Sequence, residues 1–196
     1  MPEPSIHPPD DPAASAERSD EHLLRAFVAA ADREAFATLA RRHERELLGA
    51  AKGLLGGHEA LALEAVQESW VRVLRFAKSF QGSCAVRTWL YRIVINQCRD
   101  VAERERRMAA RAKASRPAPA TTSERGGTLR DLVSALPDAQ REAILLAYHA
   151  SMTHTQAAEA LSIPLGTFKS RLSSALASLR AALPDSANER TQEVRT

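Results

Sequence analysis

Residues 153 to 176 read T-H-T-Q-A-A-E-A-L-S-I-P-L-G-T-F-K-S-R-L-S-S-A-L, and this stretch predicts two helices joined by a tight turn at S-I-P. Thr153 and Gln156, three residues apart, form a capping box that fixes the start of the first helix. Apolar side chains recur at spacings of three and four along the second helix and define its buried face: Leu165, Phe168, Leu172, Leu176 and Leu179. The pattern is typical of a helix-turn-helix.

The opposite face of the second helix carries small hydroxyls and two cations, namely Thr167, Lys169, Ser170, Arg171, Ser173 and Ser174. Short side chains permit close approach to the DNA major groove, and the cations can reach phosphates or guanine edges. This predicts duplex DNA binding, although a helical hairpin with a solvated polar face would show the same pattern.

Prolines divide the chain, because each removes a helix hydrogen bond and clashes with the preceding turn. Five of the ten lie in the first twelve residues, and none lies between residues 13 and 116, a stretch with apolar residues at helical spacing. We therefore predict an all-α protein with two small helical domains. The expected parts are an acidic, proline-rich leader (1–19), a first domain (20–112), a linker (113–127), a second domain (128–183) and a polar tail (184–196).

Start and stop signals give the expected helices. Asp32 is a good N-cap, and Gly56 and Gly57 should end the helix that it begins. The linker has almost no large apolar side chains and cannot form a core, so a flexible tether is expected. The expected helices span 20–31, 32–55, 58–78 and 86–112 in the first domain, and 129–136, 138–150, 155–161 and 165–183 in the second.

Composition excludes several classes of protein. With 196 residues, 44% of them apolar, the chain can bury one ordinary core or two small ones. No apolar run approaches the roughly 18 residues of a membrane span, and the acidic start is unlike a secretory signal, so we expect a cytoplasmic protein without membrane insertion. Two cysteines, Cys84 and Cys98, can form neither a disulfide framework nor a paired zinc site.

The net charge of +3 conceals an uneven distribution. Residues 1–20 hold five acidic side chains and one basic one, a net charge of −4. Residues 87–116 hold nine basic and three acidic side chains, a net charge of +6. Such a cluster of basic side chains in a soluble protein indicates a polyanionic partner.

Two segments of the first domain suggest binding functions. In E-A-V-Q-E, Glu64, Gln67 and Glu68 share a helix face, which is either a solvated surface or a docking surface for a basic partner. The stretch F-Q-G-S-C-A-V-R-T-W-L-Y-R-I-V-I-N-Q-C-R-D, residues 80–100, places a loop before a helix rich in cations and aromatic rings. This chemistry suits single-stranded nucleic acid. The alternative is that the aromatic residues are core and the arginines solvated, and we expect both to hold in part.

Together these segments resemble the sigma factors of bacterial RNA polymerase, in particular the small two-domain extracytoplasmic-function (ECF) group. E-A-V-Q-E is similar to the family's D-L-V-Q-E, and F-Q-G-S-C-A-V-R-T-W-L-Y-R-I to its F-x-G-x-S-x-F-R-T-W-L-Y-R-I. L-P-D-A-Q-R-E-A-I-L-L and P-L-G-T-F-K-S-R-L are similar to L-P-x-x-Q-R-E-V-x-x-L and V-G-T-V-K-S-R-L. The likeness covers about residues 20 to 183, apart from the linker.

The resemblance implies partners and roles. Glu64, Gln67 and Glu68 would dock on the clamp helices of the polymerase largest subunit, while the flap is a further expected contact. The minus-ten promoter element would be opened and held by Ser79, Phe80, Gln81, Gly82, Ser83, Arg87, Arg92, Asn96 and Arg99. The minus-thirty-five element would be read by Thr167, Lys169, Ser170, Arg171 and Ser174. The linker would run toward the RNA exit path, and an anti-sigma factor would restrain the protein. No catalytic residue, metal or cofactor is implied.

The chain departs from the family pattern at several positions. Glu64 replaces Asp, Val86 stands where Phe is common, and Ser162 replaces a turn glycine. After Arg171 the family's basic run is missing, and only Arg180 remains. Because each lost phosphate contact weakens affinity and its salt dependence, we expect weak binding to the minus-thirty-five element.

Two other functions compete with this interpretation. A dimeric helix-turn-helix repressor would explain residues 153 to 183 but would leave the first domain without a role. A metal-dependent hydrolase finds little support, because His43-Glu44 and His58-Glu59 lack the second histidine of H-E-x-x-H. Within the loop, Cys84 next to a basic helix start could be redox-sensitive, or simply an inert small residue.

Overall fold

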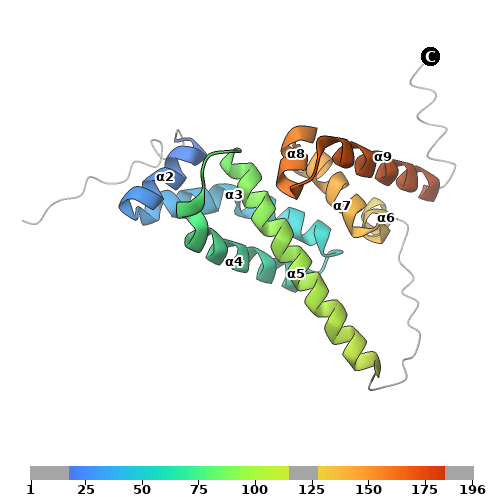
Figure 1. Cartoon of the computed structure of the whole chain (residues 1–196). Helices are drawn as coiled ribbons and strands as arrows, with labels where there is room; N and C mark the ends of the chain where they lie inside the picture. Colours follow the sequence, from blue (N-terminus) through green and yellow to red (C-terminus); the bar gives the residue numbers. More distant parts are fainter. Residues whose placement is uncertain (1–17, 115–127, 184–196) are drawn as a thin grey trace, which may run out of the picture.

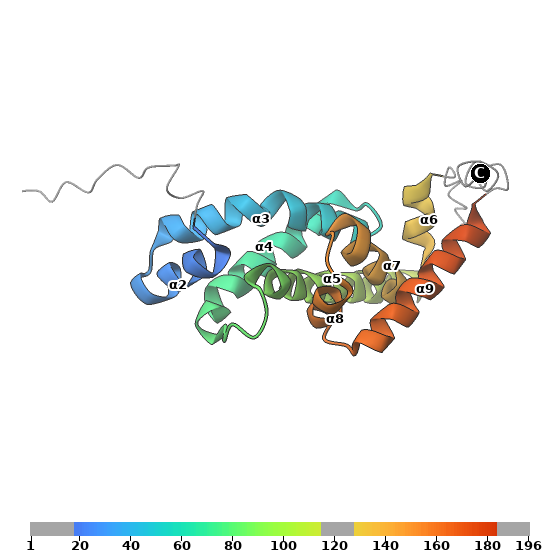
Figure 2. The same cartoon turned by 90° about the horizontal axis from the view of Figure 1, so that it is seen from above.

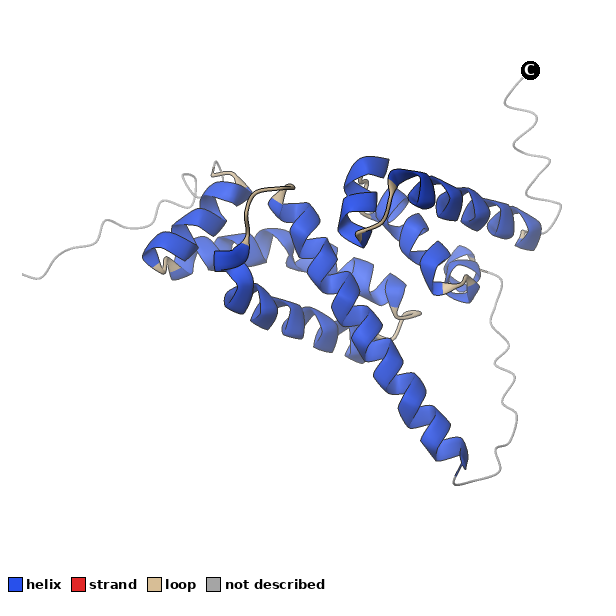
Figure 3. Ribbon diagram, in the orientation of Figure 1, coloured by secondary structure: helices blue, strands red, loops and turns tan. Residues whose placement is uncertain are grey.

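The computed structural model describes residues 18–114 and 128–183, and all regular elements in these two ranges are helical, as predicted. Domain 1 contains α2 (Asp20–Ala30), α3 (Arg33–Leu54), α4 (Glu59–Phe76), the short 3₁₀ turn η1 (Ala77–Ser79) and α5 (Val86–Ala114). Domain 2 contains α6 (Leu129–Ala135), α7 (Asp138–Ile144), the π-helical turn η2 (Leu145–His149), α8 (His154–Leu161) and α9 (Leu165–Ala182). Figure 3 shows both sets as blue helices joined by short loops.

Capping side chains and glycines mark helix ends at the positions that the sequence predicted. The Asp32 side chain accepts hydrogen bonds from the backbone N–H groups of Glu34 and Ala35, both at 3.0 Å, and so caps α3. Gly56 and Gly57 take positive φ values of 64° and 88° directly after α3, as their expected role in ending it requires. Thr153 and Gln156 form the reciprocal capping box of α8.

The predicted helix over residues 138–150 is confirmed almost to its end, but its second half is π-helical and not α-helical. After Ile144 the backbone widens into η2, where the N–H of Ala150 bonds the carbonyl of Leu145 at 2.9 Å. Ser151 follows with a φ of 48°, which ends the segment. The helix expected to end at 112 continues to Ala114, so the segment predicted as linker begins within α5. The other linker residues, the leader up to 17 and the tail from 184 lie outside the described residues.

The two domains pack against each other. The sequence predicted two domains joined by a flexible linker but did not predict this contact between them. In domain 1, α3, α4 and α5 pack together, and α2 packs against α3 and α5. Domain 2 lies along α3 and α5, with α8 against α5 and η2 against α3 (Figure 2). The C-terminal half of α5 projects beyond this body (Figure 1). Within the described residues, no helix is both long and apolar enough to cross a membrane.

Candidate nucleic-acid and polymerase interface

The three residues predicted to dock on a partner protein, Glu64, Gln67 and Glu68, all lie on α4. Gln67 and Glu68 are exposed, as a contact surface requires. Glu64 instead accepts two hydrogen bonds from the Arg104 guanidinium of α5, one of them at 2.9 Å, and this pairing lowers the pKa of Glu64. The carboxylates therefore differ: Glu68 faces solvent, whereas Glu64 joins α4 to α5.

Beside these polar residues, α4 exposes a row of apolar side chains that we did not single out from the sequence. Leu63, Val71 and Leu74 are 43%, 40% and 48% exposed. With Gln67 they follow spacings of three and four, so they form one stripe. The signal was present in the sequence, since α4 carries more apolar residues than one buried face needs. An apolar stripe beside carboxylates is typical of a protein-binding surface.

The loop between η1 and α5 borders a pocket of about 350 Å³ that the sequence did not reveal. Gln81, Gly82 and Ser83 are exposed in this loop, and Gly82 has a φ of 72°. Phe80 packs on Trp89 of α5 with ring centroids 5.2 Å apart, which fixes the base of the loop. The pocket is lined by Leu24, Val28 and Phe80, together with polar Glu21, Arg25, Lys78 and Gln81.

The start of α5 combines one buried aromatic residue, Tyr91, with the partly buried Trp89 and with arginines that are partly exposed, so the expectation of a core role for the aromatic residues holds in part. Leu90 and Tyr91 are buried in the domain 1 core, whereas Arg87 and Arg92 are partly buried and Asn96 is exposed. Asn96 accepts a hydrogen bond from Arg99 at 3.2 Å. Tyr91 therefore belongs to the core, whereas Arg87, Arg92 and Asn96 keep part of their surface accessible.

Glu46 of α3 orients Arg87, a role that residue spacing in the sequence does not predict. Its carboxylate accepts from the Arg87 guanidinium and from the hydroxyl of Tyr91, the latter at 2.7 Å. Burial opposes ionisation of Glu46, but these hydrogen bonds outweigh it and hold its pKa below the usual value. Burial, together with the bond to Glu46, raises the pKa of Tyr91.

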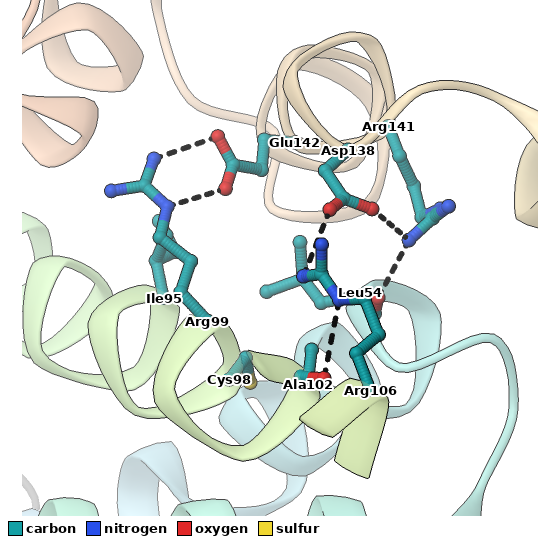
Figure 4. Close-up of a pocket in the computed structure, with 9 residues that line it drawn as sticks. All are labelled: Leu54, Ile95, Cys98, Arg99, Ala102, Arg106, Asp138, Arg141 and Glu142. Carbon is teal, nitrogen blue, oxygen red and sulfur yellow. Dashed lines mark hydrogen bonds and ion pairs between the residues drawn. The ribbon is translucent and has the colours of Figure 1, made fainter. Parts of the chain in front are cut away.

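Three of the arginines predicted to hold DNA instead contact domain 2. Arg99 donates from Nε and Nη2 to the two carboxylate oxygens of Glu142, both at 2.7 Å (Figure 4). Arg92 donates to the backbone carbonyl of Glu159 at 3.2 and 2.7 Å, and Arg87 donates to the backbone carbonyl of Ala150. The structure thus places all three predicted residues in a contact between the domains.

The predicted recognition face of α9 is accessible. Lys169, Ser170 and Ser174 are exposed, while Thr167 and Arg171 are partly buried. On the opposite side Phe168 and Leu172 enter the core, as the spacing predicted. Leu165 is 38% exposed and contributes less to this core than expected. The polar face of α9 therefore remains free for a ligand even while domain 2 contacts domain 1.

Nothing in the described part of the chain suggests a metal centre. No group of three His, Cys, Asp or Glu residues within residues 18–114 and 128–183 is arranged to hold an ion.

The two cysteines lie in different environments. Cys84 is partly buried in the loop between η1 and α5, whereas Cys98 is buried in α5. Burial raises the pKa of Cys98 to about 12.

Comparison with known proteins finds one family model that matches within domain 1 and a second that matches domain 2. The family model for sigma-70 region 2 matches residues 39–108, and that for sigma-70 region 4 matches residues 127–179. The chain is 35% identical over 169 residues to the ECF RNA polymerase sigma factor SigM of Mycobacterium tuberculosis (strain ATCC 25618 / H37Rv), covering 83% of this chain and 84% of SigM. It is 30% identical to the RNA polymerase sigma factor NccH of Alcaligenes xylosoxydans xylosoxydans, covering 85% and 96%.

Among solved structures, that of CnrH in complex with the cytosolic domain of CnrY is similar, with a TM-score of 0.62 and 27% identity. This likeness covers 83% of the present chain and 96% of CnrH, and therefore includes both domains.

Proposed function

The chain belongs to the ECF group of the sigma-70 family, and from this premise we propose that it binds core RNA polymerase and directs promoter-specific transcription initiation. The observation that carries the proposal is the pairing of a region 2 match with a region 4 match in one chain. A stand-alone repressor is not favoured, because it would use α8 and α9 and leave residues 39–108 without a role. The family acts without catalysis, so we infer no enzymatic step.

For polymerase docking we propose the α4 face, with Gln67 and Glu68 as polar contacts and Leu63, Val71 and Leu74 as the apolar part. The clamp helices of the polymerase largest subunit are the proposed partner. Glu64 contributes indirectly, since its pair with Arg104 fixes α4 against α5. Charged groups at the rim of such a surface steer association, while the apolar stripe supplies buried area.

For the minus-ten element we propose that the pocket beside Phe80 accepts an unstacked base. Extracting a base costs a few kcal/mol, so a pocket gives specificity only where other contacts hold the open strand. Its volume of about 350 Å³ is ample for one base, and Arg25 and Lys78 supply cations at its lining. Ser79, Gln81, Gly82 and Ser83 would contact the base or its neighbours, and Arg87, Arg92, Asn96 and Arg99 would follow the backbone.

For the minus-thirty-five element we propose that α9 enters the major groove with Thr167, Lys169, Ser170, Arg171 and Ser174. Residues 130–183 contain five basic and four acidic side chains, a net charge of only +1. Because phosphate contacts dominate affinity, duplex binding by the isolated chain should be weak and salt-sensitive. Polymerase would compensate by presenting both domains to the promoter together.

Three further proposals follow from the family. The flap of the polymerase is proposed as a contact of domain 2, and an anti-sigma factor as the regulator. Two proteins of similar fold were solved in complexes: CnrH with the cytosolic domain of CnrY, and the sigma factor RpoE with the anti-sigma factor NepR from Bartonella quintana. We propose action in the cytoplasm, where the polymerase lies.

The docking proposal is tested by co-purification with core polymerase. Glu68→Lys reverses an exposed charge in the docking face and should reduce recovery of polymerase at least about tenfold, as expected for a repulsive charge at an interface contact. Glu44→Lys makes the same change at an exposed position on α3 outside that face, and should leave recovery unchanged. Equal recovery with both variants would overturn the docking assignment.

A further inference from the structure

Glu21 of α2 caps the start of α5 from a distant part of the chain. Its Oε1 accepts a hydrogen bond from the backbone N–H of Val86 at 3.2 Å, across 65 positions of sequence. Val86 is the first residue of α5 and is fully buried, and Ala85 before it has no side-chain acceptor. The first N–H groups of a helix lack partners within the helix and favour negative charge nearby. Glu21 therefore supplies a contact that the loop before α5 cannot.

The same carboxylate lines the pocket beside Phe80. The helix α2 packs against both η1 and α5, which places Glu21 between the two ends of the loop that borders this pocket. Glu21 is partly buried, and among the described residues its second oxygen, Oε2, has no hydrogen-bond partner. Because the backbone of α5 holds Oε1, the carboxylate has a fixed place and one oxygen left for a ligand.

Two cations line the pocket without a partner in the described part of the protein. Arg25 and Lys78 are exposed, and neither forms a hydrogen bond or an ion pair with another residue of ranges 18–114 and 128–183. Leu24, Val28 and Phe80 add apolar surface to the same lining. A bound nucleotide needs these three kinds of group: cations for its phosphates, an apolar surface for the base ring, and a polar atom for the base edge.

We propose that Glu21 determines which base the pocket accepts, and that it selects cytosine or adenine. This inference rests on the proposed function, because it assumes that the pocket receives an unstacked base. The amino group of cytosine or adenine can donate to a carboxylate oxygen. Thymine and guanine carry a carbonyl oxygen at the corresponding position. Two acceptors that face each other form no hydrogen bond, so these bases would leave polar atoms unsatisfied in the pocket.

The capping role and the selective role of Glu21 can be separated by one substitution. Glu21→Gln keeps an oxygen that can accept from the N–H of Val86, but presents an amide NH₂ group in place of Oε2. The amide donates where the carboxylate accepts, so the variant should fold normally and lose the preference for an amino group. Glu44→Gln is the matched control, because Glu44 is exposed on α3 and does not line the pocket. Thermal unfolding followed by circular dichroism establishes that both variants are folded.

Base preference is measured by fluorescence anisotropy, with oligo-dC and oligo-dU strands of equal length at pH 8. Each protein is tested as the full chain assembled with core polymerase, and core polymerase alone gives the background. A homopolymer places the same base in the pocket in every register, and uracil has a carbonyl oxygen where cytosine has its amino group. The wild type and Glu44→Gln should bind oligo-dC about five- to tenfold more tightly than oligo-dU, as expected for one base contact. For Glu21→Gln the ratio should fall to about one or below.

The same oligo-dC to oligo-dU ratio for the wild type and folded Glu21→Gln would overturn the selective role of Glu21. Failure of the pocket itself gives a different result, which Arg25→Ala reveals. Loss of this cation should weaken binding of both strands by about two- to fivefold without changing their ratio. If Arg25→Ala leaves both affinities unchanged, the pocket does not hold nucleic acid, and the proposed minus-ten contact is wrong together with the role of Glu21.

Discussion

Glu46→Gln should destabilise domain 1, because Glu46 joins α3 to α5 through Arg87 and Tyr91. Glutamine keeps the shape and one acceptor oxygen but removes the charge. Hydrogen bonds to charged groups contribute about 1.5–3 kcal/mol and neutral ones about 0.5–1.5 kcal/mol, so the expected loss is about 1–2 kcal/mol. Glu46 and Arg87 are 29% and 31% exposed, so screening by solvent favours the lower end of that range.

The same variant should change how stability depends on pH. The pKa of Glu46 is lower in the folded protein than its ordinary value of 4.5, so its stabilising contribution is complete above that value. The contribution is lost as the pH falls through the folded pKa, because the unfolded chain binds the proton more readily. The stability difference between wild type and Glu46→Gln should therefore be largest near pH 7 and shrink at about pH 3.

Urea unfolding followed by circular dichroism at both pH values measures the difference. The matched control is Glu34→Gln, which breaks a pair with Arg41 whose side chains are 50% and 64% exposed. Exposed pairs contribute little, so the control should change stability by less than about 0.5 kcal/mol. A Glu46→Gln protein as stable as the wild type at pH 7, or a difference that persists undiminished at low pH, would refute the assigned role of Glu46.

Three further outcomes are expected. Ser162→Gly should raise the free energy of unfolding by about 0.5–1 kcal/mol, because Ser162 has a φ of 56° that glycine adopts without strain. A lower melting temperature than that of the wild type would contradict this. Phe168→Ala should destabilise domain 2 by about 3–5 kcal/mol, since its ring is fully buried, and an unchanged unfolding transition would disprove its core role. In the native protein at pH 8, iodoacetamide should modify Cys84 much faster than Cys98, whose pKa is raised to about 12 by burial; mass spectrometry of digests would reveal equal rates if this is wrong.

The sequence predicted features that depend on neighbouring residues. Asp32 and the pair of Thr153 and Gln156 cap helices through contacts within three residues, so their roles could be read from spacing alone. The buried position of Phe168 followed from apolar periodicity in the same way.

Features that depend on contacts between distant segments could not be predicted. Arg99 and Glu142 are 43 residues apart, and the importance of Gly53 is evident only when Leu145 lies against it. Glu142 is buried in α7, where a charged side chain needs a partner. The identity of that partner required the fold.

The central claim, that this chain directs promoter-specific initiation, is tested most directly by run-off transcription on genomic fragments from the same bacterium, with start sites mapped. Core polymerase supplemented with the chain should produce discrete transcripts that core polymerase alone does not. Upstream of their start sites, the fragments should share two sequence elements, one for each domain. Transcripts that are the same with and without the chain would contradict the account.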